Sequence, residues 1–258
     1  MGQVLGIIGT GHFAGYLVAG LCRAGDGPRI VVSPRNATVA QRLAEAFGVG
    51  IAADNQGVVD AADTVILTTP PADGADPAAA LTWREGQVAI TMVAGLALAP
   101  FARATQPATA VRAMASAAVA LGASPFYLYP DHAAARALGA RLGAVQAMAD
   151  EATFEAASVL PVYYALLFRL IGEAADWCVE NGVEPAAARE LVAMSMQGAA
   201  VMAAKQDDLG IEEIVESLAT KGGLTERGLI SLEADDAFGA WGRALDLVLR
   251  RLRGDLEA

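Results

Sequence analysis

The segment LGIIGTGHFAGYLVAGL, residues Leu5 to Leu21, decides how the rest of the chain is read. An apolar run leads into a glycine-rich turn, and a helical pattern of small residues follows. The spacing Gly9-x-Gly11-x-x-Ala14 between a strand and a helix is typical of a dinucleotide-binding loop. Gly9 makes the tight turn, Gly11 lets the backbone approach a diphosphate, and Ala14 lets helix and strand pack closely. N–H groups at the helix start would hold the phosphates. The alternative is a tight turn without a ligand.

The composition is that of a globular protein. The chain has 258 residues, of which 55% are hydrophobic, enough for a sizeable core in one or two domains. The apolar stretches are interrupted before they reach membrane-spanning length, and no basic segment precedes the first strand. We therefore expect a cytoplasmic protein that does not bind a membrane. Cys22 and Cys178 lie in helical patterns without a ligand cluster, so we expect neither a metal site nor a disulfide.

The net charge narrows the choice of partner. At pH 7 the formal charge is −11, and no basic face is visible in the sequence. Nucleic-acid binding needs such a face, because the phosphate backbone is itself negative. We therefore expect a small-molecule substrate and no nucleic acid as partner.

Two textures of sequence divide the chain near Asp150. Before it, short apolar runs alternate with helical patterns, as in successive βαβ units of a mainly parallel sheet. The expected strands are Val4 to Ile8, Ile30 to Val32, Thr64 to Thr68, Val88 to Met92, Ala110 to Met114 and Ala144 to Met148. After it, helical patterns rich in Ala, Leu and Met replace the strands. We predict an α/β fold, with an N-terminal Rossmann dinucleotide-binding domain over 1–150 followed by an all-helical dimerisation domain over 151–258.

The helical half contains long patterns with few charges. One helix is expected to stop at Asn181-Gly182, a helix C-terminal signal. The next is expected to run from Pro185 to Ala204, and its sequence, PAAARELVAMSMQGAAVMAAK, has few charges over most of its circumference. Such a helix is buried on several sides. A second subunit would supply that burial, so we expect a homodimer, or a higher oligomer built from dimers, through the C-terminal helices.

The end of the second strand indicates which dinucleotide is bound. An NAD site usually has an Asp or Glu there, about 20 residues after the glycines, to hold the ribose hydroxyls. Here the chain reads IVVSPRN and has no acid at that place. Ser33, Arg35 and Asn36 offer a hydroxyl, a bidentate cation and an amide, which suit a 2′-phosphate. We therefore predict NADP(H) rather than NAD(H). The alternative is that Arg35 is a solvated loop charge.

Several segments share the motifs of one known family: the GTGHFA loop, ITMVAG (Ile90 to Gly95), VRAM (Val111 to Met114), the helical NGVEPAAARELVAMSMQGAAVM, and TKGGLTERGLISLE (Thr220 to Glu233). By these motifs the chain resembles the pyrroline-5-carboxylate reductase family over nearly its whole length. Such reductases have a Rossmann domain and a helical domain that interlocks with a second subunit. The resemblance implies hydride transfer from NADPH to the C=N bond of a small cyclic imine. The substrate is either pyrroline-5-carboxylate, with proline as product, or a related imine.

The resemblance also implies which residues form the site. Around the cofactor they are the residues of the first loop and of the SPRN segment, together with His12, Phe13, Thr69, Pro70, Ala94 and Gly95. Around the substrate they are Gly222, Gly223, Leu224 and Thr225. Thr225 matches the family threonine after the glycine pair and is expected to hydrogen-bond the substrate or its nitrogen. The N–H groups of the two glycines would bind a substrate carboxylate. The alternative is a glycine turn with a helix-capping threonine.

Three aromatic or imidazole side chains are further candidates. Tyr163 or Tyr164 would act as a proton donor or as a wall on which the substrate stacks. The alternative is that these tyrosines belong to the core or to the subunit interface. His12 either reaches the diphosphate or nicotinamide side of the cofactor, or fills the loop.

Some segments depart from the family pattern. His12-Phe13 stand where the family has Asn-Met, Pro70 replaces a lysine, and the segment after VRAM, ASAAVALG, has lost an Asn and both prolines. SVLPVYYALL stands where the family has SGSGPAY, so a small glycine-lined patch becomes bulky. This patch corresponds to Ala157 to Leu160 in one alignment and to Leu160 to Tyr163 in another. The cofactor half of the resemblance is therefore stronger than the substrate half.

Two other functions remain open. A non-catalytic NADP-binding regulatory or sensor protein would explain the altered substrate segments, although the KGGLT segment is retained. A β-hydroxyacid dehydrogenase-like oxidoreductase shares the layout, but that class uses a lysine near the start of the long interdomain helix. This chain has no lysine between Asp150 and Lys205.

Overall fold

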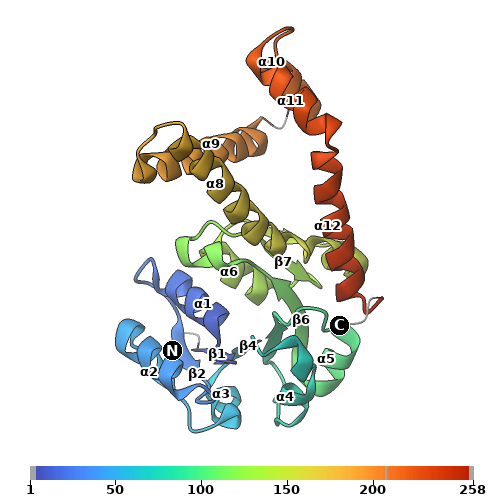
Figure 1. Ribbon diagram of the computed structural model, residues 1–258. Coiled ribbons are helices and arrows are strands. Elements are labelled where there is room, and N and C mark those ends of the chain that lie inside the picture. Colours follow the sequence, from blue (N-terminus) through green and yellow to red (C-terminus); the bar gives the residue numbers. More distant parts are fainter. Residues whose placement is uncertain (1–3, 207, 256–258) are drawn as a thin grey trace. The chain divides into compact units, whose positions relative to one another are not determined.

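An eight-stranded sheet organises the first part of the chain in the computed structural model, which describes residues 4–206 and 208–255 (Figure 1). The strands are β1 Val4–Ile8, β2 Arg29–Val32, β3 Gly50–Ile51, β4 Thr64–Leu67, β5 Val88–Thr91, β6 Thr109–Met114, β7 Phe126–Tyr129 and β8 Val145–Ala147. Their order is β3-β2-β1-β4-β5-β6-β7-β8, and every neighbouring pair is parallel except β6 and β7. The order reverses between β1 and β4. Ligands of such sheets bind at the carboxyl ends of the strands at this switch point.

Helices cover both faces of the sheet. They are α1 His12–Cys22, α2 Ala37–Phe47, α3 Asn55–Ala61, α4 Asp76–Ala79, α5 Leu98–Ala104, α6 Ala133–Leu142 and α7 Glu151–Ala157, with short 3₁₀ turns η1 Pro71–Asp73, η2 Ala117–Leu121 and η3 Leu160–Val162. Successive strand residues point to opposite faces. Ile7 therefore joins a buried cluster with Leu17 of α1, whereas Ile8 joins another with Val58 of α3 and Phe101 of α5.

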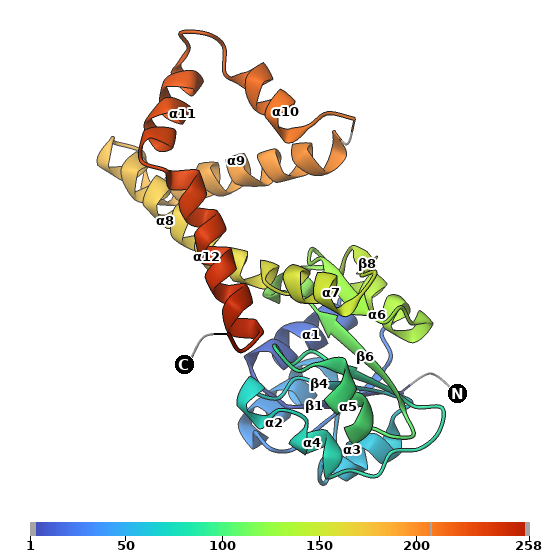
Figure 2. The same cartoon turned by 90° about the vertical axis from the view of Figure 1, so that its right-hand side faces the viewer.

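A second compact unit, Val162–Val248, consists of helices. These are α8 Tyr163–Glu180, α9 Pro185–Lys205, α10 Ile211–Leu218, α11 Leu224–Ala234 and most of α12 Ala237–Leu252. Within this unit α8 and α9 pack against each other (Figure 2). Among its described residues only Ala188 is buried, so the unit has almost no core of its own.

The predicted fold class is confirmed: a mainly parallel Rossmann sheet precedes a helical domain. Two strands, β3 and β7, were not expected from the sequence. β3 has two exposed residues, Gly50 and Ile51, and so lacks an apolar run. β7 begins directly after Pro125, and its FYLY sequence is buried at three of four positions without alternating. Neither segment therefore shows the pattern that marks the other strands.

The division into units differs from the predicted domain boundary. The sequence places the boundary after Asp150, whereas the first compact unit extends to Pro161 and takes up the described residues from Leu249 on. Helix α7 lies in this first unit because Phe154 is buried there and because Glu151 pairs with Arg112 of β6 at 2.6 Å. Packing, not helix content, sets the boundary.

One stretch in this region has a membrane-like composition. Within Glu151–Glu180, an 18-residue window has a mean hydropathy of 1.4, and the stretch is long enough to cross a membrane. This is weak evidence, because core helices of soluble proteins share the property. The stretch also comprises three elements, α7, η3 and α8, rather than one regular helix.

Candidate functional site

The loop after β1 has the geometry of a phosphate-binding turn. Gly9 has a φ of 103°, and a Cβ placed on it would lie 2.8 Å from the Thr68 carbonyl, so only glycine fits. Gly11 precedes α1, and a Cβ there would meet nothing within 4 Å. No side chain caps α1. Its first N–H groups are therefore available to an anion. Ala14 is fully buried, as its predicted packing role requires.

Two hydroxyl groups hold this loop from both sides. The Gly9 N–H donates to Ser33 Oγ at 3.0 Å, and the Thr68 hydroxyl donates to the Gly9 carbonyl at 2.6 Å. Ser33 follows β2 and Thr68 follows β4, the two neighbours of β1. Ser33 is fully buried. In this structure the hydroxyl lies inside the protein and supports the loop, and its predicted contact with a 2′-phosphate stays a prediction.

Asn36 and Arg35 have different surroundings. Asn36 caps α2, since its Oδ1 accepts the Val39 N–H at 3.2 Å, so that oxygen has a structural role. Arg35 is exposed, and its Nη1 donates to Asp73 Oδ2 at 2.9 Å. Of the three residues expected at the 2′-phosphate, Arg35 is the one with an exposed positive charge. A cavity of about 430 Å³ lies beside it, lined by Pro34, Arg35, Ala53, Asp54, Asn55, Gln56 and Leu81.

The carboxyl ends of β4 and β5 supply the next residues. Thr69 is buried, and its Oγ1 is the one buried side-chain oxygen or nitrogen of the described residues that has no hydrogen-bond partner. Buried hydroxyls normally have a partner, so this one points to a group that completes the site. Pro70 and Gly95 are exposed, and Ala94 is half-buried. The glycine cradle, the uncapped helix and the orphan hydroxyl fit a dinucleotide.

The two residues after Gly11 have unequal surroundings. His12 is exposed at the first position of α1. Phe13 is half-buried and packs against the hydrophobic core of the sheet. Phe13 thus contributes packing beneath the loop, whereas His12 is accessible to a ligand.

The turn before α11 is more closed than the sequence suggests. The Gly222 N–H donates to the Glu226 carboxylate at 2.6 Å, and the Gly223 N–H donates to the Thr220 carbonyl at 2.8 Å. Both N–H groups are occupied, so neither is free for a substrate carboxylate in this structure. Leu224 and Thr225 are exposed in the first turn of α11. The N-cap is Gly223, so the capping role considered for Thr225 is not observed.

The tyrosines at the start of α8 take part in helix packing. Tyr163 stacks on Trp241 of α12, with ring centroids 5.7 Å apart. Tyr163 and Tyr164 are both half-buried. These residues and Thr225 belong to the helical unit, whereas the glycine loop, Arg35 and Thr69 belong to the Rossmann unit.

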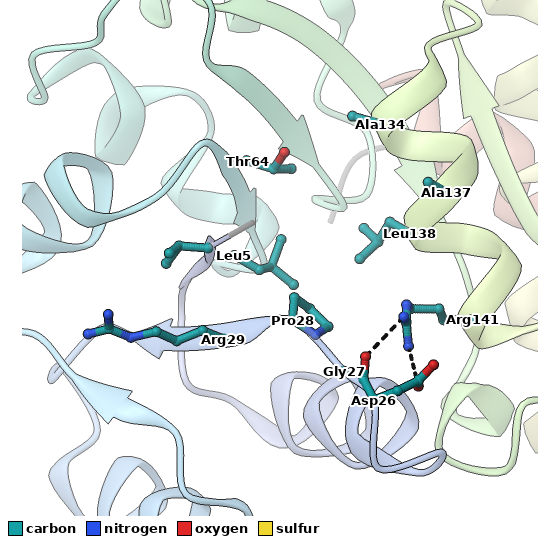
Figure 3. A pocket seen from close by; sticks show the side chains of 11 residues that line it. Leu5, Asp26, Gly27, Pro28, Arg29, Thr64, Ala134, Ala137, Leu138 and Arg141 are labelled. Atoms are coloured by element: carbon teal, nitrogen blue, oxygen red, sulfur yellow. Dashed lines mark hydrogen bonds and ion pairs between the residues drawn. The ribbon is translucent and has the colours of Figure 1, made fainter. Parts of the chain in front are cut away.

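Another cavity, of about 300 Å³, lies at the amino ends of β1, β2 and β4 (Figure 3). Leu5, Pro28 and Leu138 form its apolar wall. Arg141 at its rim donates to Asp26 Oδ1 at 2.8 Å, which holds the pKa of the Asp26 carboxyl below its usual value. The cavity therefore lies at the opposite strand ends from the glycine loop and contains none of the predicted site residues.

Sequence reasoning missed two side chains of the cofactor region. Thr68 bonds the loop, and Asp73 pairs with Arg35 from 38 positions away. Thr68 directly precedes the predicted Thr69 and ends the expected strand Thr64 to Thr68. The same strand-end pattern could therefore have identified it. Asp73 gave no signal, because an acidic residue after a strand is common in any loop.

The fold and the loop together define a class, the dinucleotide-binding proteins with an N-terminal Rossmann domain and a C-terminal helical domain. Residues 4–95 match the family model described as NADP oxidoreductase coenzyme F420-dependent. Residues 151–254 match the one described as pyrroline-5-carboxylate reductase dimerisation. Together with the fold, the two matches support a member of the pyrroline-5-carboxylate reductase family. The predicted cofactor, NADP(H), is confirmed by the first match, because that family consists of NADP oxidoreductases.

Solved structures agree on the fold. The 1-pyrroline-5-carboxylate reductase of Streptococcus pyogenes matches with a TM-score of 0.85 and 22% identity, over 98% of each chain. The pyrroline carboxylate reductase of Plasmodium falciparum, with NADP bound, matches with 0.86 and 16% identity, over 98% of this chain and 97% of the other. A reductive aminase of Aspergillus terreus in complex with NADPH matches with 0.60 and 18%, over 98% and 92%. No curated protein sequence matches the chain.

Proposed function

We propose that the chain is an NADPH-dependent reductase that transfers a hydride to the C=N bond of a small cyclic imine, either pyrroline-5-carboxylate or a related one. The observation that carries this proposal is the loop at Gly9. Its backbone lies too close to the Thr68 carbonyl for any side chain, and it leads into α1, a helix without a side-chain cap. The family membership supports the choice of reaction. Such an enzyme would act in the cytoplasm as a homodimer, and in proline synthesis if its product is proline.

The chain's own residues bind and orient the cofactor. Gly11 and the first N–H groups of α1 hold the diphosphate, and the Arg35 guanidinium donates to the 2′-phosphate. The orphan Thr69 hydroxyl and the exposed Gly95 flank the nicotinamide half. Bound NADPH supplies a hydride from its nicotinamide ring.

The substrate half needs position more than acid–base chemistry. A cyclic imine that arrives protonated already has an electrophilic carbon, so the protein has to align it and exclude water. We assign Thr225 as the hydrogen-bond partner of the substrate, beside Gly222, Gly223 and Leu224, with Tyr163 and Tyr164 as walls. Arg112 cannot anchor a carboxylate, because it is 3% exposed and paired with Glu151.

The direct test is to follow NADPH oxidation with four substrates: pyrroline-5-carboxylate, 1-pyrroline, a six-membered cyclic imine and a small ketone. Turnover of the imines supports the proposal. Turnover of the ketone alone would point to a β-hydroxyacid dehydrogenase-like enzyme. Comparing the first two imines shows whether a carboxylate is accepted where Glu226 already occupies the Gly222 N–H.

A non-catalytic NADP-binding regulatory protein is the second candidate. The observation that favours it is the closed glycine turn before α11, where both N–H groups already have acceptors within the chain. This function predicts tight NADPH binding without turnover of any imine.

Replacing Thr225 tests the substrate assignment. We expect Thr225→Ala to lower kcat/KM for the imine by about ten- to a hundredfold, the worth of one hydrogen bond to a charged group, while the Kd for NADPH changes little. Steady-state kinetics and NADPH titration measure the two effects. Ser231→Ala removes a hydroxyl from the same helix as control. An unchanged rate would remove Thr225 from the site.

Replacing Arg35 tests the phosphate assignment. We expect Arg35→Ala to raise the Kd for NADPH by about ten- to a hundredfold and to leave that for NADH nearly unchanged, because only NADPH has the 2′-phosphate. Calorimetric titration with both cofactors measures this. Arg29→Ala is the matched control, since Arg29 is exposed at the opposite end of the strand that precedes Arg35. Equal losses for both cofactors would contradict the assignment.

A further inference from the structure

An ion pair links the two segments that flank the glycine loop. Arg35 Nη1 lies 2.9 Å from Asp73 Oδ2. Arg35 follows β2, and Asp73 ends η1, which follows β4. Because the sheet order here is β2-β1-β4, the strand that carries the glycine loop lies between the strands that precede the two partners.

The same two segments also bind the loop beneath the ion pair. Ser33, two residues before Arg35, accepts the Gly9 N–H, and Thr68, before Asp73, donates to the Gly9 carbonyl. Neighbouring strands lie about 4.8 Å apart, so the pair has to bridge about 10 Å, which the long arginine side chain can span. The ion pair therefore bridges the segments on either side of the carboxyl end of β1.

Proline residues precede both members of the ion pair, Arg35 and Asp73, in the chain. Pro34 precedes Arg35, and Pro70 and Pro71 precede Asp73, whose N–H donates to the Pro70 carbonyl at 3.0 Å. Proline fixes φ, which limits the motion of both backbones. The guanidinium, at the end of a flexible and 65% exposed side chain, is the part that can change its partner, whereas the Asp73 carboxylate is 28% exposed.

We propose that Asp73 competes with the 2′-phosphate of NADP(H) for Arg35, and so sets how strongly the protein binds this cofactor. The inference rests on the proposed role of Arg35. In the free protein Asp73 holds the guanidinium over the loop. On binding of NADP(H) the guanidinium turns from the carboxylate to the phosphate, a dianion that accepts two of its N–H groups. NAD(H) has no such phosphate and leaves the pair in place.

The test is calorimetric titration of the full chain with NADP⁺ and NAD⁺ at low and high ionic strength. We expect Asp73→Asn to lower the Kd for NADP⁺ by up to about fivefold at low salt, the worth of an exposed ion pair. The Kd for NAD⁺ is expected to stay the same, and the gain to shrink as salt screens the pair. Asp76→Asn, the same charge change at an exposed position on α4, is the control. Asp73→Ser should repeat the result, and thermal melts establish that each variant is folded.

A double variant shows whether Asp73 acts through Arg35. In the Arg35→Ala background, Asp73→Asn is expected to leave the Kd for NADP⁺ unchanged. The inference is overturned if Asp73→Asn weakens NADP⁺ binding or leaves it unchanged. It is also overturned if Asp73→Asn lowers the Kd for NADP⁺ as much in the Arg35→Ala background as in the wild type. None of these outcomes affects the proposed cofactor site. Failure of the wild-type chain to bind either cofactor would overturn the proposed cofactor site as well.

Discussion

Gly9 carries two constraints that no other residue type meets. Its φ of 103° disfavours any side chain, and a Cβ would press on the Thr68 carbonyl at 2.8 Å. We expect Gly9→Ala to lower the free energy of unfolding by about 2 kcal/mol and to abolish NADPH binding, because the loop or β4 must move. Urea unfolding and NADPH titration measure the two effects.

A matched substitution separates this effect from that of any added methyl group. Gly50 in β3 does not have a positive φ. A Cβ on it would lie 3.6 Å from the Val31 side chain, which is an ordinary contact. Gly50→Ala is therefore expected to keep NADPH binding. A folded Gly9→Ala variant with wild-type affinity would show that the loop does not touch the cofactor.

The polar residues of the SPRN segment show that a suitable residue type does not by itself establish a phosphate contact. Ser33 and Asn36 have the groups that suit a phosphate, yet each bonds a backbone N–H nearby, at Gly9 and Val39. Small polar side chains reach only their immediate surroundings, and backbone donors in loops need acceptors. Of these three residues, only Arg35 has a side chain long enough to extend beyond the loop. Only Arg35 can therefore exchange one charged partner for another.

At the scale of elements, a buried arginine attaches α7 to the sheet. Arg112 of β6 lies 4.6 Å from the Phe154 ring centroid and pairs with Glu151, which also accepts the Leu98 N–H at 2.6 Å. Glu155 of α7 pairs with Arg253 at 3.4 Å. A buried charge needs such partners. The VRAM motif therefore acts in this chain as a structural support for α7 and α5.

Two helix caps make stability depend on pH. Glu184 accepts the Ala187 N–H at 2.9 Å, and bonds from Ala187 and Ala186 hold its pKa below the ordinary 4.5. Asp150 accepts the Thr153 N–H at 2.7 Å, and this bond and the Thr153 hydroxyl hold its pKa below 3.8. Because the folded pKa is lower than the unfolded one, the stabilisation is complete above the unfolded pKa and is lost as pH falls through the folded pKa.

Thermal melts between about pH 3 and pH 7 measure this contribution. We expect Tm to be level at the upper end and to fall once the pH drops below the ordinary carboxyl pKa values. Glu184→Gln should lower Tm at neutral pH and flatten part of the fall. Glu190→Gln, at an exposed position of the same helix, should do neither. A wild-type Tm that is level down to pH 3 would contradict the capping roles.

At the scale of the whole molecule, the helical unit lacks a core within one chain. Large apolar side chains of α9 are exposed, among them Leu191 at 58% and Met194 at 60%, while only Ala188 among the unit's described residues is buried. Exposed apolar surface of this extent marks an interaction site. Together with the match to a dimerisation domain over 151–254, it favours a homodimer through these helices.

Light scattering with size-exclusion chromatography tests the assembly. We expect the wild-type chain to elute as a dimer or larger, and Met194→Asp to dissociate it, since a charge cannot be buried unpaired. The Rossmann unit should still bind NADPH. Gln41→Asp adds the same charge at an exposed position of α2 in the Rossmann unit and measures the effect of charge alone. A wild-type monomer at micromolar concentration would refute the dimer.

The sequence by itself determined the Rossmann class, the cofactor and the helical second half, and its motifs gave the resemblance to a known reductase family. The first three depend on signals carried by neighbours in the chain: glycine spacing, apolar periodicity and the absence of an acid after the second strand. Only the tertiary structure decided that Ser33 supports the loop, that Glu226 occupies the Gly222 N–H, that α7 joins the sheet and that Asp73 holds Arg35. A polar group bonds whichever partner folding brings within about 3 Å, and that partner is set by the packing of distant segments rather than by the residues beside it.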